Sequence, residues 1–580
     1  MKKVIFSTLI IALLWSCGGN KDNEGGIHEG KGGIYYGGVF RSNEIEDFRS
    51  LYPLNVTEIV SIHVASQVYE GLVKLSQTDL STMPCLAEKW DKTGDAKTWT
   101  FYIRKDVKFQ DDPCFPDGKG REVTAKDFKY CFDKLCEVSP ENQQFGVTFT
   151  GRVEGADEYF QSTVDKKPLP GGVSGVKVID DHTLQISLKY PFAGFLNILT
   201  MPGCWLYPKE AVEKYGSDMR TTCVGTGPFQ VKNVKEGDAI VLERNKNYWA
   251  VDEFGNQMPY LDGLKFSFIK DKKSELYEFK KQNLDMTYRL PIEMIPDILD
   301  EFNHAKEGNA RFDMMVVPAL GVDYYGFQHQ SEVFRKKEVR LAFNYAIDRD
   351  KLVTYTLQGD GIPATYGIIP PSFKDYDNKA LKGYSFKPDT ARTLLAAGGY
   401  PNGKGFPKLT LQINSGGERN VQVAEVIQKM LKENLNVDVD INVMPMAEHM
   451  ENYQTGKALF WRTGWIADYP DPETFLTILY GKHVPINISD RSYVNVVRYK
   501  SAKFDSIFEL SLREVDNKKR FDLYRQADQV AIDDGAIMPI FYHENYRLVQ
   551  LWVKNCETNA MDYRDMSKVY FIPKEEVKKK

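Results

Sequence analysis

The segment 458–480 carries the side chains best suited to hold a ligand. Trp461 and Trp465 lie in a short apolar strand, and Asp468 follows in the loop after it. Tryptophan brings a large apolar face and one N–H donor, so two of them close together indicate a concave apolar surface. An aspartate beside such a surface could bind a cationic group. The alternative is a core strand followed by a solvated turn, because most turns have no binding role.

Patterns of catalysis and metal binding are missing from the sequence. The 8 histidines form no HExxH or similar spacing, and no GxSxG motif supplies a nucleophile. The glycine turn at 225–229 lacks the lysine and the following helix of a phosphate loop, so we expect a structural turn. Two of the carboxylates Glu70, Asp468 and Asp471 could form an acid pair. A secreted hydrolase is therefore the alternative that belongs to another functional class, that of enzymes. We expect no enzyme, no metal and no cofactor.

Length and charge limit the architecture and the partners. A chain of 580 residues is too long for one hydrophobic core, so two or three lobes are expected. The formal net charge is −5 and no basic stripe occurs, which argues against nucleic acid as a partner.

The N-terminus has the pattern of an export signal. Lys2 and Lys3 give the first residues a positive charge. Residues 4–15 then form an apolar run that is too short to span a membrane stably. The run ends at Cys17 in a sequence that resembles a bacterial lipobox, so Cys17 is the predicted lipidation site. Residues 18–33 form a predicted flexible tether. We expect a lipid-anchored protein outside the cytoplasm; an ordinary signal peptide with an incidental cysteine is the alternative.

An oxidising compartment permits disulfides between the remaining cysteines. Cys204 and Cys223 bracket a predicted helix and are the candidate pair. Cys131 and Cys136 lie on one predicted helix but point to different sides, so they are not expected to pair with each other.

Periodicity places the main elements along the chain. Helical spacing of apolar residues predicts helices at 55–73, 124–135, 335–357, 388–397, 421–435 and 521–531. Strand patterns occur at 34–40, 99–103, 176–188, 409–413, 437–443 and 536–542. The succession 409–443 is a strand, a helix and a strand, which is the unit of a parallel sheet.

The order of several short segments resembles the family 5 extracellular solute-binding proteins, the group of the dipeptide- and oligopeptide-binding proteins of ABC importers. No single segment is diagnostic, but the ordered set is specific and spans nearly the whole mature chain. The matching segments are 69–72 (YEGL), 87–90 (AEKW), 99–109, 123–128 (VTAKDF), 225–229, 242–249, 339–352, 363–371 and 391–400.

The resemblance implies an α/β protein with the two-lobed periplasmic-binding-protein fold of type II, with mixed sheets and a hinge between the lobes. Lobe I is expected at 34–69, 173–315 and 535–575, an extra domain at 70–172, and lobe II at 316–534. The chain is expected to cross between the lobes near 321–327 and near Gly535, and ligands are enclosed by hinge closure.

The resemblance also assigns roles in ligand binding. Oligopeptide-binding members carry a similar Arg-x-Gly-Trp-x-x-Asp run, in which the aspartate, here Asp468, takes the α-ammonium of the peptide. Arg462 matches an arginine that can help to hold a ligand carboxylate. Besides Asp468 and Arg462, the predicted cleft residues are Trp461, Trp465, Tyr469, Tyr324, Tyr325 and Tyr542. For Tyr324, Tyr325 and Tyr542, which lie near the crossing segments, core packing is the alternative.

These assignments imply a monomeric binding protein that delivers short peptides to the permease of an ABC transporter. One alternative keeps the fold and changes the ligand to a metal chelate, haem, an opine or an oligosaccharide. Another alternative is a chaperone-like or sensory lipoprotein without a role in transport.

Overall fold

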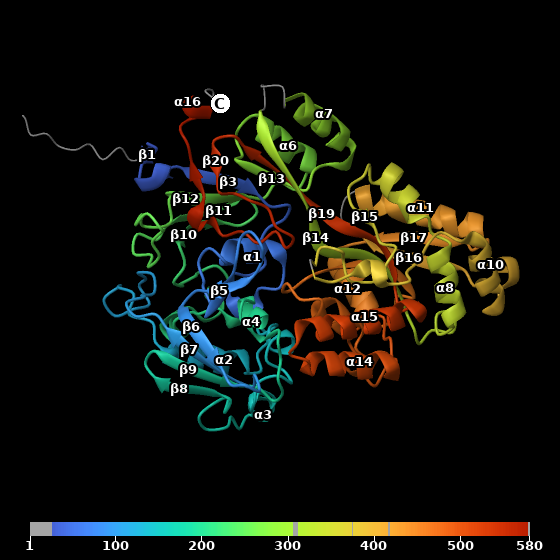
Figure 1. The fold of residues 1–580 in the computed structure, drawn as a ribbon, viewed down its shortest axis with the longest axis horizontal. Helices are drawn as coiled ribbons and strands as arrows, with labels where there is room; N and C mark the ends of the chain where they lie inside the picture. Colours follow the sequence, from blue (N-terminus) through green and yellow to red (C-terminus); the bar gives the residue numbers. More distant parts are fainter. Residues whose placement is uncertain (1–25, 306–310, 374, 416–417, 493, 578–580) are drawn as a thin grey trace, which may run out of the picture.

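The computed structural model describes residues 26–305, 311–373, 375–415, 418–492 and 494–577. Two halves lie side by side (Figure 1). One half contains two four-stranded sheets, and the other is built on a seven-stranded sheet. Two long strands of the larger sheet, β14 and β19, run from the first half into the second. The predicted α/β class and two-lobed architecture of type II are confirmed.

The first four-stranded sheet has the order β10-β11-β12-β3. Its strand β3 comes from the start of the described chain and pairs in parallel with β12, so distant segments complete one sheet. Its strands are β3 (Val39–Asn43), β10 (Phe229–Lys235), β11 (Ala239–Arg244) and β12 (Gly263–Ser267).

The second four-stranded sheet has the order β6-β7-β9-β8 and packs with α2 (Ala125–Leu135) and α3 (Ala156–Val164). Its strands are β6 (Ala87–Lys92), β7 (Thr98–Ile103), β8 (Val176–Asp180) and β9 (Thr183–Ser187). The predicted end of the extra domain at 172 is too early, because β9 hydrogen-bonds to β7 as the central strand pair of this sheet. Helix α2 begins as predicted, since the Thr124 N–H donates to Asp127 Oδ2 at 2.8 Å.

The seven-stranded sheet has the order β13-β19-β14-β18-β16-β17, with β15 paired to β19. The predicted strand–helix–strand unit is confirmed, because β16 and β17 pair in parallel and α11 (Glu418–Leu435) connects them. The predicted crossing segment 321–327 lies in β14. The strands are β13 (Met286–Tyr288), β14 (Phe312–Phe327), β15 (Ile362–Pro363), β16 (Leu409–Asn414), β17 (Val439–Met444), β18 (Phe460–Ile466) and β19 (Met538–Gln550).

The remaining elements are short. The small strands are β1 (His28–Glu29), β2 (Tyr35–Tyr36), β4 (Val73–Leu75), β5 (Thr82–Pro84), β20 (Val553–Lys554) and β21 (Tyr570–Phe571). The remaining helices are α1 (Ile59–Ala65), α4 (Phe195–Ile198), α5 (Lys209–Tyr215), α6 (Lys272–Lys280), α7 (Ile295–Ala305), α8 (Lys337–Tyr345), α9 (Arg349–Lys351), α10 (Pro388–Ala397), α12 (Met446–Gln454), α13 (Glu473–Leu476), α14 (Ala502–Arg513), α15 (Asn517–Asp533) and α16 (Lys574–Val577).

Two predicted helices are shorter than their apolar patterns. Helix α1 begins only at Ile59, because the Glu58 side chain accepts from the Ser61 N–H and caps it. Helix α8 ends at Tyr345, and Asp348 caps a separate short helix by accepting from the Lys351 N–H. In both places a side-chain cap fixes a boundary that hydrophobic periodicity does not reveal.

The predicted tether at 18–33 is too long. Strand β1 pairs with β2, with His28 opposite Tyr36, so the folded part already includes residues that were assigned to the tether. Cys17 and the predicted export signal lie outside the described residues.

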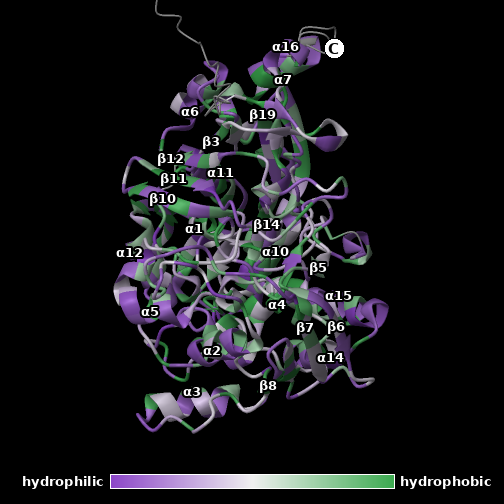
Figure 2. Ribbon diagram, turned by 90° about the vertical axis from the view of Figure 1, so that its left-hand side faces the viewer, coloured by the Kyte–Doolittle hydropathy of each residue, from purple (hydrophilic) through white to green (hydrophobic). Residues whose placement is uncertain are grey.

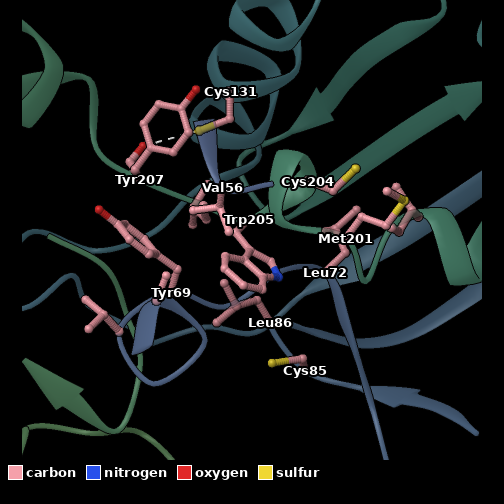
Figure 3. Close-up of a cluster of buried hydrophobic side chains, with 14 of the residues drawn as sticks. Val56, Tyr69, Leu72, Cys85, Leu86, Cys131, Met201, Cys204, Trp205 and Tyr207 are labelled. Atoms are coloured by element: carbon pink, nitrogen blue, oxygen red, sulfur yellow. Dashed lines mark hydrogen bonds between the residues drawn. The ribbon is translucent and has the colours of Figure 1, made fainter. Parts of the chain in front are cut away.

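The predicted disulfide between Cys204 and Cys223 is wrong, because both are free thiols in the structure. Both side chains are buried, and Cys204 lies in an apolar cluster around Trp205 (Figure 3). Burial raises the pKa of Cys223 to about 12, so this thiol stays protonated and packs as a small apolar group. Cys131 belongs to the same cluster and donates to the Tyr207 carbonyl at 3.2 Å.

Within the part of the chain that the structure describes, no helix is both long and apolar enough to span a bilayer. The helices carry hydrophilic and hydrophobic residues together (Figure 2).

Candidate functional site

A cavity of about 370 Å³ lies between the two halves of the molecule. One wall comes from the segment 146–152 and Tyr190, which belong to the half with β6–β9. The other wall comes from the half with the large sheet and includes Trp465, Asp468 and Tyr469. The remaining residues of that wall are Glu473, Thr477, Tyr480, Lys482, His483, Val494, Phe508, Glu509, Leu512 and Arg513.

Strand β18 presents an open backbone edge at this place. It pairs with β14 along its length, but it pairs with β16 only at Phe460 and Trp461. The Ala467 N–H donates to the Leu320 carbonyl of the β14 side at 2.9 Å. Because backbone direction alternates along a strand, Gly464 and Ile466 turn their N–H and C=O groups away from β14. Within the described residues, no other strand covers that edge.

Thr474 organises the loop that follows β18. Its hydroxyl accepts from the Asp468 N–H at 3.4 Å and from Trp465 Nε1 at 3.2 Å. The same hydroxyl lies 3.5 Å from Asp468 Oδ2, to which it donates. Thr474 is in the first turn of α13 and is buried. One threonine therefore fixes both the aspartate and the tryptophan that the sequence predicted, although the sequence pattern did not single it out.

The Asp468 carboxylate has no cationic partner within 4 Å among the described residues. Solvent reaches its side chain from the cavity, yet protein surrounds the group on the other sides. This enclosure is the main cause that raises the pKa of Asp468 to about 7, and the charge of Glu473 adds to it. A bound ammonium would supply the missing positive charge.

Glu473 links the two walls of the cavity. Its Oε1 lies 3.6 Å from Arg152 Nη2, which comes from the opposite half, and its Oε2 accepts from the Tyr469 hydroxyl. Arg152 also donates to the Thr148 carbonyl at 3.0 Å. Sequence analysis missed Arg152, because no local pattern connects it with the segment 458–480.

A buried ion pair holds the loop between β18 and α13 against helix α15. Arg520 Nη1 of α15 binds Asp471 Oδ2, and both side chains are almost fully buried. Arg520 Nη2 donates to Asn517 Oδ1 at 3.0 Å. Asp471 is thus a structural anchor of the loop that presents Asp468.

Arg462 is held away from the cavity by charges on the long strands. Its guanidinium binds Asp323 Oδ1, and its Nη1 donates to Asn414 Oδ1 at 3.0 Å. Asp323 Oδ2 in turn lies 2.7 Å from His543 Nε2. The positive charge of Arg462 lowers the pKa of Asp323 against the effect of its burial. Asp323 already balances the charge of Arg462. The predicted role of Arg462 in holding a ligand carboxylate stays a prediction.

The structure places four predicted cleft residues in the hydrophobic core: Trp461, Tyr324, Tyr325 and Tyr542. The Trp461 ring stacks on Tyr453 of α12, with the ring centres 5.8 Å apart. A Cβ atom at Gly326 would approach the Trp461 indole to 2.5 Å, so glycine is required there. The Tyr542 hydroxyl donates to the Gly367 carbonyl at 2.8 Å. None of the four lines the cavity, so the alternative of core packing describes their positions.

The residues considered for a hydrolase do not meet in one site. Glu70 is buried and accepts from Tyr248, Trp249 and Thr226 at 2.8–2.9 Å. Asp471 is neutralised by Arg520, so Asp468 alone of the three faces the cavity. Over the described ranges, no cluster of three or more His, Cys, Asp or Glu side chains could hold a metal ion.

Known proteins of similar sequence share most of the chain. The periplasmic oligopeptide-binding protein OppA of Salmonella typhimurium is 30% identical over 521 residues, which cover 88% of each protein. The dipeptide-binding protein DppE of Bacillus subtilis is 27% identical over 516 residues, or 87% of each.

Solved structures show the same fold. The murein tripeptide binding protein MppA of Escherichia coli matches with a TM-score of 0.74 and 25% identity, over 93% of this chain and 99% of that one. The binding protein DppA of Helicobacter pylori, solved in complex with the peptide STSA, matches with a TM-score of 0.77 and 24% identity, over 92% and 98%.

The family model described as bacterial extracellular solute-binding proteins, family 5 Middle, matches residues 81–484, which include β18, Asp468 and the wall around them. The two-lobed fold, the cavity between the lobes and this match agree. The chain belongs to family 5 of the bacterial extracellular solute-binding proteins.

Proposed function

We propose that this protein captures short peptides between its two lobes, as a monomer, and delivers them to the permease of an ABC transporter. The observation that carries the proposal is the carboxylate of Asp468. It faces the cavity at the end of an open strand edge, and no cationic side chain of the described residues lies within 4 Å of it. A peptide supplies both complements, because its α-ammonium matches the carboxylate and its backbone can pair with Gly464 and Ile466.

The relatives support this ligand class. The proteins of similar sequence from Salmonella typhimurium and Bacillus subtilis are named as binding proteins for oligopeptides and dipeptides. Trp465 gives the same cavity an apolar wall that tolerates varied side chains. We further propose that a lipid on Cys17 holds the protein to a membrane outside the cytoplasm.

The test compares Asp468→Asn with the unchanged protein, using alanine peptides of two to five residues and their N-acetylated forms in titration calorimetry. Asparagine keeps the size but removes the charge. We expect the substitution to weaken binding of free peptides roughly 10- to 100-fold, because a charge-assisted hydrogen bond is lost. Acetylated peptides should bind the unchanged protein as weakly as free peptides bind the variant.

Asp238→Asn is the matched control, since Asp238 pairs with Lys235 on the surface, far from the cavity. Equal affinity of free and acetylated peptides for the unchanged protein would contradict the role of Asp468. Failure of every peptide to bind would contradict the peptide proposal itself.

A further inference from the structure

An ion pair joins the two halves of the molecule at the cavity around Asp468. Arg152 Nη2, from the half with β6–β9, lies 3.6 Å from Glu473 Oε1, at the start of α13 in the half with the large sheet. Both residues line the cavity, and only 14% of the Arg152 side chain and 1% of the Glu473 side chain are exposed. Among the described residues, no other cationic nitrogen lies within 4 Å of the Glu473 carboxylate.

Each partner of this ion pair is held in place by its own half. Arg152 Nη1 donates to the Thr148 carbonyl at 3.0 Å, and the guanidinium carbon lies 5.4 Å from the centre of the Phe192 ring. The Glu473 carboxylate accepts from the Tyr469 hydroxyl. These contacts within each half do not depend on the other half. A movement of one half against the other therefore makes or breaks the contact between Arg152 and Glu473 without rebuilding either side.

Apolar contacts between the halves lie beside the ion pair. Tyr469 belongs to the half with the large sheet, yet its buried ring is part of the apolar cluster formed mainly by the opposite half. Leu512 of α14 packs against the apolar clusters of both halves. The structure therefore shows the halves closed against each other at this cavity, with a charged contact and apolar contacts side by side.

The charge of Glu473 also acts on Asp468. After burial, it is the second cause that raises the pKa of Asp468. Burial raises the pKa of Glu473 itself, and the charges of Arg152 and Arg520 act in the opposite direction. Arg520 is already bound to Asp471, so Arg152 is the cation that can balance Glu473. When the halves separate, two carboxylates on one wall of the cavity lose that cation.

We propose that Arg152 and Glu473 form a latch that holds the two halves closed over the cavity. Arg152 is a positioning residue, because closure brings its charge beside Glu473 and lets Asp468 keep its own negative charge. The latch joins the two halves and does not contact the ligand. It should therefore act mainly on the rate of ligand release, since the halves must open before a ligand leaves. This inference goes beyond the proposed function and does not depend on the ligand being a peptide.

The experiment compares the unchanged protein with Arg152→Gln in two measurements. Small-angle X-ray scattering gives the radius of gyration of the ligand-free proteins. Stopped-flow tryptophan fluorescence gives the association and dissociation rates of Ala-Ala-Ala, since Trp465 lines the cavity. We expect Arg152→Gln to have the larger radius of gyration, because more molecules are open. It should release the peptide roughly tenfold faster, while the association rate changes by less than about twofold.

Three further variants distinguish a latch from a general structural role. Arg152→Lys keeps the positive charge and should recover part of both differences. The double variant of Arg152→Gln and Glu473→Gln should release the peptide no faster than the faster single variant, because both substitutions remove the same contact. Lys189→Gln is the matched control, since Lys189 pairs with Asp157 and Glu158 of its own half. It should change neither measurement.

Equal radii of gyration and equal release rates for the unchanged protein and Arg152→Gln would overturn the latch. Additive effects of the two single substitutions in the double variant would also overturn it, because the residues would then act separately. If Ala-Ala-Ala does not bind the unchanged protein, the proposed function is in question and the scattering comparison decides on the latch. Thermal unfolding checks that each variant folds. Should Arg152→Gln not fold, Glu473→Gln tests the same contact from the other half.

Discussion

At the scale of single residues, two tryptophans in one strand have different roles. Trp461 and Trp465 are four positions apart in β18, so their side chains share a face. Helix α12 covers Trp461 through Tyr453, and Trp461 is fully buried. Trp465 donates to Thr474 of α13 but is only partly buried, and it lines the cavity. Coverage by a neighbouring element, and not residue type, decides which tryptophan can contact a ligand.

Peptide affinity should depend on pH with the charge of Asp468. The raised pKa of about 7 means that the carboxyl group is largely neutral below pH 7 and must lose its proton to bind an ammonium. Affinity should therefore fall as pH decreases through 7, by roughly tenfold per pH unit further down. It should also fall above roughly pH 8, where the α-amino group of the peptide loses its proton.

Calorimetry from pH 5 to pH 9 measures this profile. Asp468→Asn should lack the acidic limb and keep the basic one, so it serves as the control. A flat profile between pH 5 and pH 7 for the unchanged protein would count against the role of Asp468.

At the scale of elements, the loop between β18 and α13 is stiffened at several places. Asp471 is bound by Arg520 of α15, Glu473 contacts Arg152 across the cavity, and Thr474 holds Asp468. A loop restrained in this way presents its carboxylate in one place before the ligand arrives, and this limits the entropy lost on binding.

Asp471→Ala should therefore damage both stability and binding. The substitution leaves the Arg520 guanidinium buried without its carboxylate, which typically costs about 3–5 kcal/mol in the free energy of unfolding. Urea denaturation gives the stability, and calorimetry at a temperature where the variant is folded gives the peptide affinity.

Asp522→Ala is the control for Asp471→Ala, because Asp522 lies on the same helix as Arg520 but pairs with the partly exposed Arg525. A change below about 1 kcal/mol is expected for this surface pair. An equally small effect of Asp471→Ala would show that the loop does not depend on Arg520.

At the scale of the whole molecule, the first and last parts of the chain are joined by a buried network of charges. Asp562 binds Arg564, Arg547 and His63, and Arg564 Nη1 also binds Glu44 Oε1 at 2.6 Å. The arginines lower the pKa of Asp562 well below its usual range despite its burial. The network connects β19 and the C-terminal segment with α1.

Asp562→Asn should destabilise the whole protein, because it leaves two buried guanidinium groups with one carboxylate, that of Glu44. We expect a loss of about 3–5 kcal/mol in the free energy of unfolding, measured by urea denaturation at pH 7. Asp238→Asn, at an exposed pair with Lys235, should change stability by less than about 1 kcal/mol. A loss for Asp562→Asn no larger than for that control would contradict the structural role of the network.

The sequence by itself determined the features that depend on neighbouring residues. Hydrophobic periodicity located α11 and the strands on both sides of it, and the Thr124–Asp127 capping box located the start of α2. The ordered segments indicated the family and the two-lobed fold, which the structure and the family match confirm. Asp468 and Trp465 were predicted as cleft residues from one continuous stretch of sequence, and both line the cavity.

Only the tertiary structure decided which of the predicted side chains reach the cavity. Elements that are remote in sequence bury Trp461 and Tyr542 and neutralise Arg462 through Asp323. The fold also leaves Cys204 and Cys223 as free thiols. Arg152 could not be found from local patterns, because it is a single arginine that reaches Glu473 only through the folding of the two halves against each other. Local propensity acts between near neighbours, whereas burial and charge compensation are set by contacts across the whole fold, and these exist only once the chain has folded.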